Sequence, residues 1–165
     1  MAVVADSSPL IYLAALSDFH FLKELFGSVL IPPAVYREVV QQGHGFPVKG
    51  AVEAALGDWL SVRIIQDMRQ VAEVSRAGRL HAGESEAIVL AQECHADRLL
   101  LDDQRGVRYA RGVGIAVTRT PVIYGEAKLR GWIPNVQEKL DALPKLGFRL
   151  KDQDYRLVLA KVGEL

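Results

Sequence analysis

The sequence predicts an α/β fold built on a mainly parallel central sheet. Short apolar runs are typical of buried strands, and segments with helical spacing follow them. Strands that alternate with helices in this way indicate parallel strands joined by crossover helices. The chain has no repeat and no long Gly, Ser or Pro linker, so we expect one domain over residues 1–165. We expect its core over about residues 1–135 and a helical extension over about residues 136–165.

The chain opens with a strand that leads directly into a helix. Residues 3–5 form a continuous apolar run, as in a strand covered on both faces. Ser8 and Pro9 suit the start of the helix, because Ser can accept from a free N–H and Pro tolerates the first turn. Asp6 is therefore predicted at the carboxyl end of a strand, just before a helix.

The next segments repeat this alternation. We expect a helix over residues 18–26, a strand over residues 28–31 and a helix over residues 33–43 that ends at Gly43. Glu38 lies within the last of these helices, at the edge of its apolar stripe.

The second half of the chain continues with further helices and strands. Helices are expected near residues 50–57, 68–80, 82–94 and 103–112, and strands near residues 60–65, 98–102 and 114–118. Three helical stretches then follow over about residues 120–165, separated by Gly131, Pro134 and Gly147. Glu84 and Glu86 fall in the first turn of a predicted helix, where negative charge is favourable.

Several acidic residues fall where a parallel sheet forms its binding sites. Asp6 and Asp102 are both predicted at strand ends, and such sites form outside the carboxyl ends of the strands. Carboxylates brought together repel one another unless a divalent cation compensates their charge. Mg²⁺ and Mn²⁺ prefer carboxylate oxygen and water, and can align an attacking water at a phosphodiester. The pattern favours phosphoryl-ester hydrolysis and leaves the substrate open.

Each acid taken singly also has a structural interpretation. Asp6 before Ser-Ser-Pro is equally typical of a helix cap. Glu38 alone fits a solvated helix position, and Glu84 and Glu86 fit favourable charges at a helix start. Asp102 and Asp103 fit a turn with a cap. Their placement at successive strand-to-helix boundaries is what favours the functional interpretation.

Four segments of the chain, taken in order, form a recognisable set: 3-VVADSSPLIYLA-14, 31-IPPAVYREVV-40, 83-GESEAIVLA-91 and 98-RLLLDDQRGVRYARGVGIAVT-118. Together they resemble the PIN-domain family, and in particular its stand-alone bacterial and archaeal branch related to VapC-type toxins. The resemblance covers roughly residues 1–135. It implies a three-layer α/β/α domain that binds Mg²⁺ or Mn²⁺ and cleaves RNA.

The resemblance also implies a catalytic set of acids. The first acid falls on Asp6, the second on Glu38, the third on Glu84 or Glu86, and the fourth on Asp102 or Asp103. Asp6 together with Asp102 or Asp103 would bind the metal. Ser7 resembles the hydroxyl residue that supports such a site by hydrogen bonding.

Our leading hypothesis is a metal-dependent endoribonuclease that acts as the toxin of a toxin–antitoxin pair. Its partners would be an RNA substrate, a small antitoxin protein and a second copy of the chain. One alternative is a metal-dependent phosphohydrolase, although Asp6-Ser7-Ser8 lacks the Asp-x-Asp of the haloacid-dehalogenase type. The other is a non-catalytic module that binds a protein. No glycine-rich nucleotide loop or GxSxG motif is present to suggest another enzyme class.

Basic residues follow the predicted acidic pair at a regular spacing. Arg105, Arg108 and Arg111 recur every three residues, with Arg119 nearby, and could contact RNA phosphates. A solvated helix face explains the spacing equally well. The formal net charge of zero gives no general preference for nucleic acid.

The cellular setting is predicted from composition. A single cysteine excludes an internal disulfide, and the start MAVVADSS has no basic region or long apolar stretch of a signal peptide. The apolar runs are too short to span a membrane. We therefore expect a cytoplasmic protein that is not membrane-bound.

Overall fold

The computed structural model describes residues 1–42 and 46–165, which form two compact units, Met1–Thr118 and Arg119–Leu165. The first unit contains, in chain order, β1 (Val3–Ala5), α1 (Ser7–Ala15), α2 (Phe21–Phe26), β2 (Val29–Ile31), α3 (Pro33–Tyr36), η1 (Arg37–Gln41), α4 (Phe46–Ala55), β3 (Leu60–Val62), α5 (Met68–Gly78), α6 (Ala82–Glu93), β4 (Arg98–Leu100), α7 (Gln104–Gly112) and β5 (Val117–Thr118). The second contains α8 (Thr120–Leu129), α9 (Gln137–Lys145) and α10 (Asp152–Lys161).

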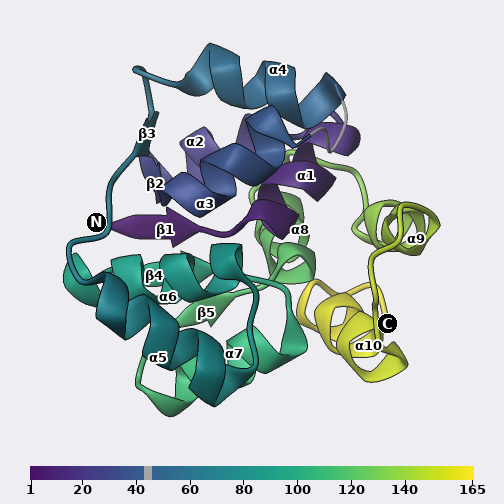
Figure 1. Cartoon of the computed structure of the whole chain (residues 1–165). Helices are drawn as coiled ribbons and strands as arrows, with labels where there is room; N and C mark the ends of the chain where they lie inside the picture. Colours follow the sequence, from purple (N-terminus) through teal and green to yellow (C-terminus); the bar gives the residue numbers. More distant parts are fainter. Residues whose placement is uncertain (43–45) are drawn as a thin grey trace. The chain divides into compact units, whose positions relative to one another are not determined.

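The five strands form one sheet in the order β3-β2-β1-β4-β5, and every neighbouring pair is parallel. β1 is the central strand (Figure 1). Its Val4 is in register with Leu30 of β2 and Leu99 of β4. Helices flank the sheet, which confirms the predicted α/β class with a parallel sheet and the three-layer α/β/α arrangement.

The core explains why such short strands are stable. Residues 3–5 are at most 1% exposed, as their continuous apolar run predicts for a strand covered on both faces. A cluster of buried side chains joins β1 and β4 to α5, α6 and α7. Residues 87–91 of α6 are all 2% exposed or less, so this helix is enclosed on nearly all sides. That enclosure fixes the start of α6, where Glu84 and Glu86 lie.

Several element boundaries differ from the sequence prediction. The first helix begins at Ser7 and its N-cap is Asp6, whose backbone is extended, so the expected cap at Ser8 was wrong. The helix expected over residues 33–43 is divided into α3 and the π-helical turn η1, in which Gln42 N–H donates to the carbonyl of Arg37 (2.9 Å). Its expected end, Gly43, lies outside the described residues.

The second unit consists of the three helices that the sequence predicts after residue 120. α8 contacts both α9 and α10. Leu140, Leu143, Val158 and Leu159 are buried, so these apolar positions pack inside the protein. Gly131 and Gly147, with φ of 80° and 97°, follow α8 and α9 in a backbone conformation that favours glycine.

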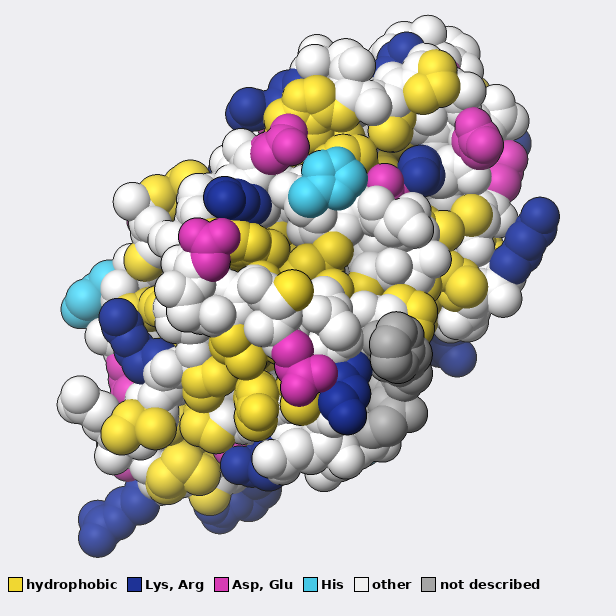
Figure 2. Space-filling model, turned by 90° about the horizontal axis from the view of Figure 1, so that it is seen from above, with side chains coloured by type: hydrophobic (Ala, Val, Ile, Leu, Met, Phe, Trp, Pro, Cys, Tyr) yellow, Lys and Arg dark blue, Asp and Glu magenta, His cyan; other side chains and the backbone are white. Residues whose placement is uncertain are grey.

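None of the helices over the described residues has both the length and the apolar character that crossing a membrane requires. The face shown in Figure 2 carries positive, negative and apolar side chains interspersed, without one dominant basic surface.

Candidate acidic site

The acidic site begins at the carboxyl ends of β1 and β4. The backbone N–H of Asp6 donates to the carbonyl of Leu100 (2.9 Å), so strand pairing continues one residue past β1. This bond places Asp6 beside the end of β4, and Asp102 follows two residues after that end. Both carboxylates are buried, with Asp6 3% and Asp102 7% exposed. Asp6 thus directly follows its strand, as predicted, whereas the strand predicted to end at Asp102 ends two residues earlier.

Gly83 brings the start of α6 against Asp6 and Glu38. A Cβ atom at position 83 would collide with Oε1 of Glu38 and would lie 3.3 Å from Oδ1 of Asp6. The two carboxylates therefore occupy the space that any other residue at position 83 would fill. This glycine was not predicted as a site residue, and its signal in the sequence is a glycine within the first turn of a predicted helix.

Ser7 holds the second acid. Its hydroxyl Oγ donates to Oε2 of Glu38 at 2.7 Å, in a part-buried hydrogen bond between α1 and η1. Because Ser7 directly follows Asp6 in the chain, one short segment places an acid in the site and orients another. This contact matches the supporting role that the resemblance implies for Ser7.

Five carboxylates lie close enough for their charges to affect the pKa of Asp6 or of Glu84. Burial raises the pKa of Asp6 well above its usual range; the Ser7 N–H offsets part of this, and nearby carboxylates raise the pKa further. Burial also raises the pKa of Glu84, against the effect of the His81 N–H. The charges of Glu38, Asp102 and Asp103 raise the pKa of Asp6, of Glu84 or of both. With Asp6 and Glu84 themselves, these residues form a group of five acids: Asp6, Glu38, Glu84, Asp102 and Asp103.

The two glutamates of α6 have different partners. Oε2 of Glu84 accepts from the backbone N–H of His81 (3.0 Å), which ties it to the start of its own helix. Glu86 is 5% exposed, and its Oε1 accepts from the N–H of Ala34 (3.0 Å). Its Oε2 lies 3.7 Å from Nη2 of Arg37. Glu86 therefore pairs with an N–H of α3 and a guanidinium of η1, whereas Glu84 belongs to the group of five acids.

The two aspartates after β4 also differ. Oδ2 of Asp103 accepts from the N–H of Gly106 (2.9 Å), so Asp103 caps α7. Its charge also raises the pKa of Glu84. Asp102 is the more buried of the two, and its charge raises the pKa of Asp6. It also raises the pKa of Tyr12, after burial, the larger cause. Tyr12 on α1 is a neighbour of the site that the sequence analysis did not identify.

The predicted arginines fall in both units. Arg105, Arg108 and Arg111 are exposed on α7, beginning two residues after Asp103. Arg119 lies in the second unit, where its Nη1 is 2.9 Å from Oδ2 of Asp154. The pairing with Asp154 compensates the charge of Arg119 within its own unit.

In the part of the chain that the structure describes, four of the five acids have no basic ion-pair partner. Over the described residues, no Lys or Arg is ion-paired with Asp6, Glu38, Glu84 or Asp103. In residues 1–42 and 46–165, no three acidic, His or Cys side chains are positioned together to hold a metal ion. The site is thus a group of carboxylates within electrostatic reach of one another, without a complete set of ligands already in place.

These features define an α/β protein with an acidic site at the carboxyl edge of a parallel sheet. The sequence matches the model of the family DUF3368, described as a PIN domain, over residues 2–164, and the chain belongs to that family. No curated protein matches the chain. PIN domains are generally nucleases and generally use divalent metals, which supports a nuclease-type hydrolase function.

Proposed function

We propose that the chain is an endoribonuclease that depends on Mg²⁺ or Mn²⁺. The observation that supports this most strongly is the buried carboxylate of Asp6, which lies in the field of three further acids. A divalent cation would compensate this charge. Without one, burial and like charges oppose the ionised form of Asp6.

The residues present fit such an ion. Carboxylate oxygens are the donors that Mg²⁺ and Mn²⁺ prefer, and Mg²⁺ usually takes only one or two of them directly. The absence of a side chain at Gly83 leaves room for the carboxylates of Asp6 and Glu38 at the start of α6. We assign metal binding to Asp6 and Asp102, the two buried aspartates at the strand ends, with Asp103 beside them.

The remaining acids would position the reacting groups. A bound ion would supply Lewis-acid stabilisation of the phosphodiester and lower the pKa of a bound water. Glu38, held by Ser7, and Glu84, held by the His81 N–H, each keep one carboxylate oxygen outside these two hydrogen bonds. Such an oxygen can accept a proton from the attacking water and orient it.

RNA is proposed as the substrate because exposed cations follow the site along α7. Arg105 and Arg108 lie two and five residues after Asp103, and guanidinium groups bind phosphates in a bidentate manner. The acids would then act on one phosphodiester while these arginines bind its neighbours.

The test is cleavage of a labelled RNA in Mg²⁺ or Mn²⁺. Asp6→Asn is expected to lower the cleavage rate about 1,000-fold, the scale for losing a group that stabilises developing charge. Asp58→Asn is the matched control, because Asp58 is exposed and its ion pair is with exposed Lys23, so the rate should be unchanged. Circular dichroism of both variants checks that they fold.

Three results would contradict the proposal. Equal cleavage by Asp6→Asn or in EDTA would assign the activity to a contaminant or to other residues. Hydrolysis of a simple phosphate ester without RNA cleavage would favour a phosphohydrolase. Absence of both activities, with no Mn²⁺ binding by calorimetry, would favour a non-catalytic binding module.

We further propose that the chain acts as the toxin of a toxin–antitoxin pair. The support for this is its resemblance to the stand-alone VapC-like branch in the four segments named above. Expression of the chain in a bacterial host is expected to arrest growth, and Asp6→Asn is expected to relieve the arrest. Equal arrest by both proteins would argue against a toxin that acts by cleavage.

A further inference from the structure

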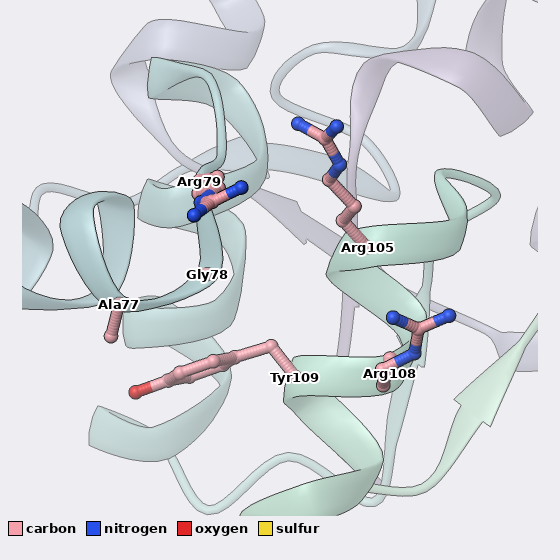
Figure 3. A pocket seen from close by; sticks show the side chains of 6 residues that line it. All are labelled: Ala77, Gly78, Arg79, Arg105, Arg108 and Tyr109. Carbon is pink, nitrogen blue, oxygen red and sulfur yellow. The ribbon is translucent and has the colours of Figure 1, made fainter.

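The first unit has a surface pocket with a volume of about 390 Å³, and its lining residues lie close in sequence to the acids Glu84 and Asp103. One wall is the end of α5, with Ala77, Gly78 and the following Arg79, and the other is α7. The α7 wall presents Arg105, Arg108 and Tyr109. Figure 3 shows the three arginines around the hollow and the Tyr109 ring extending from α7 toward Ala77. The proposed function uses neither Arg79 nor Tyr109.

We propose that this pocket binds one nucleotide of a single-stranded RNA, next to the phosphodiester that is cleaved. The arginines would take its phosphate, and the Tyr109 ring would stack on its base. The proposal rests on the proposed function, because it extends the substrate of that site by one position.

The arginines form an anion-binding set. Arg79, Arg105 and Arg108 are exposed, and over the described residues none is ion-paired with a carboxylate. Three like charges in one pocket repel one another, and an anion relieves that repulsion. Each guanidinium also presents a planar set of donors that matches phosphate oxygens.

Arg79 occupies a backbone position at which glycine is common. It caps the end of α5 with φ 55° and ψ 53°, a left-handed conformation in which glycine is common and most side chains are disfavoured. The side chain at this strained position is a long cation that lines the pocket. The cap thus adds a charge where glycine would have left none.

Tyr109 is held as a wall of the pocket. It is half-buried and packs against the core of the first unit. A Cβ atom at Gly78 would lie 3.3 Å from Cδ2 of Tyr109, so the absence of a side chain there lets the ring approach the end of α5. A fixed aromatic ring beside cations is the combination with which proteins bind an unpaired base and its phosphate.

Both walls of the pocket lie close in sequence to acids of the acidic site. On α7, Asp103 precedes Arg105 by two residues and Arg108 by five. Five residues of helix advance about 7.5 Å along the axis, a distance on the scale of one or two nucleotides. On the other wall, Arg79 precedes Glu84 by five residues, and Glu84 lies in the field of Asp103. A strand bound in the pocket therefore has a short path to the acids.

The pocket's size and composition favour a nucleotide over an acidic peptide. Its volume is at the small end of the range for ligand sites, roughly 300–1,000 Å³. The carboxylates of an acidic peptide would pair with the arginines, but the peptide would gain little binding energy from the Tyr109 ring. Loss of binding on removal of the ring therefore distinguishes the two ligands.

The test measures RNA binding without cleavage. Fluorescence anisotropy in EDTA follows the Kd of a labelled eight-nucleotide single strand for the full chain. Tyr109→Leu, which keeps an apolar side chain, is expected to raise the Kd about tenfold, and Tyr109→Phe to leave it unchanged. Arg79→Gln, Arg105→Gln and Arg108→Gln should each weaken binding and reduce the slope of log Kd against log salt by up to about 0.7.

Arg69→Gln is the matched control, because Arg69 is exposed at the other end of α5 and does not line the pocket. Its Kd should equal that of the unmodified chain. Circular dichroism confirms that each variant folds. A duplex of the same sequence is expected to bind at least about tenfold more weakly, because its bases are not free to stack on the ring.

The proposal is overturned if Tyr109→Leu and the pocket arginine variants bind as tightly as the unmodified chain. It is also overturned if Arg69→Gln weakens binding as much, or if a duplex binds equally well. Binding of a polyglutamate peptide that does not respond to Tyr109→Leu would assign the pocket to an acidic protein partner instead. Pocket-dependent binding by a chain that cleaves no RNA would refute the proposed function and leave this site standing.

Discussion

The two glutamates at the start of α6, Glu84 and Glu86, lie two residues apart and have opposite surroundings. Glu86 is matched by the N–H of Ala34 and the guanidinium of Arg37. Glu84 lies in the field of other carboxylates, Glu38 among them. A buried carboxylate with a donor and a cation is stable without a ligand, whereas a group of like charges is not. The difference separates a structural acid from a candidate catalytic one.

The strongest test of this comparison exchanges each glutamate for glutamine. Glu84→Gln keeps the helix start, because Gln also serves at this position of a capping box, but it is expected to lower RNA cleavage about 1,000-fold. Glu86→Gln loses the charge that faces Arg37 and is expected to cost about 1 kcal/mol of unfolding free energy with cleavage nearly unchanged. Cleavage assays and urea unfolding of both variants check the prediction; the reverse pattern would make Glu86 the catalytic acid.

The next test fills the space at the centre of the acidic group. Gly83→Ala would force its Cβ against Glu38, and a displaced carboxylate of this kind is expected to lower cleavage about 100-fold. Gly50→Ala in α4 is the control, because no atom lies within 4 Å of the added Cβ. Its cleavage rate should be unchanged and its helix slightly more stable. Equal rates for the two variants would show that the contact with Glu38 is not needed.

A smaller effect is expected from the residue that orients Glu38. Ser7→Ala removes the 2.7 Å hydrogen bond to Oε2 and should lower cleavage about tenfold, as loss of a supporting contact commonly does. Ser8→Ala is the neighbouring control, since within residues 1–42 and 46–165 the hydroxyl that bonds to Glu38 is that of Ser7 and not that of Ser8. The comparison fails if both variants cleave at the same rate.

The smallest effect concerns stability and its dependence on pH. Because burial raises the pKa of Asp6, the folded chain holds this proton more tightly than the unfolded chain does. The ionised carboxylate therefore costs stability above the folded pKa, and the cost vanishes below the ordinary Asp pKa of about 3.9. In EDTA at pH 7.5, Asp6→Asn should raise the unfolding free energy by about 1 kcal/mol.

Urea unfolding between pH 7.5 and pH 4 checks this stability difference. The gain from Asp6→Asn should shrink as the pH falls, whereas Asp58→Asn should show no such trend because Asp58 is exposed. A variant less stable than the unmodified chain at pH 7.5 would mean that Asp6 is already compensated within the protein.

Much of the fold could be predicted from local patterns. Residues 3–5, with their unbroken apolar run, form the central strand, and Asp6 follows at its carboxyl end. Boundaries were less predictable where backbone geometry decides them. The strand expected over residues 114–118 begins at Val117, because Gly114, with φ 85°, still belongs to the turn after α7. Apolar periodicity contains no information about such turns.

The choice between neighbouring acids could not be predicted, because contacts distant in sequence decide it. Glu86 is occupied by the N–H of Ala34, which lies 52 residues earlier in the chain. The need for glycine at position 83 depends on Glu38, which belongs to another helical segment. The Arg79 side of the pocket was missed for the same reason, since only packing of α5 against α7 brings it near Arg105.

The lengths of the outer strands have a consequence for how the protein can assemble. β3 and β5 form the two edges of the sheet and contain only three and two residues. An added strand from another molecule would gain few backbone hydrogen bonds there, so these edges are poor templates for fibrils. For the same reason, a protein that binds this chain by adding a strand would gain little affinity, and side chains on helices are the more favourable surface.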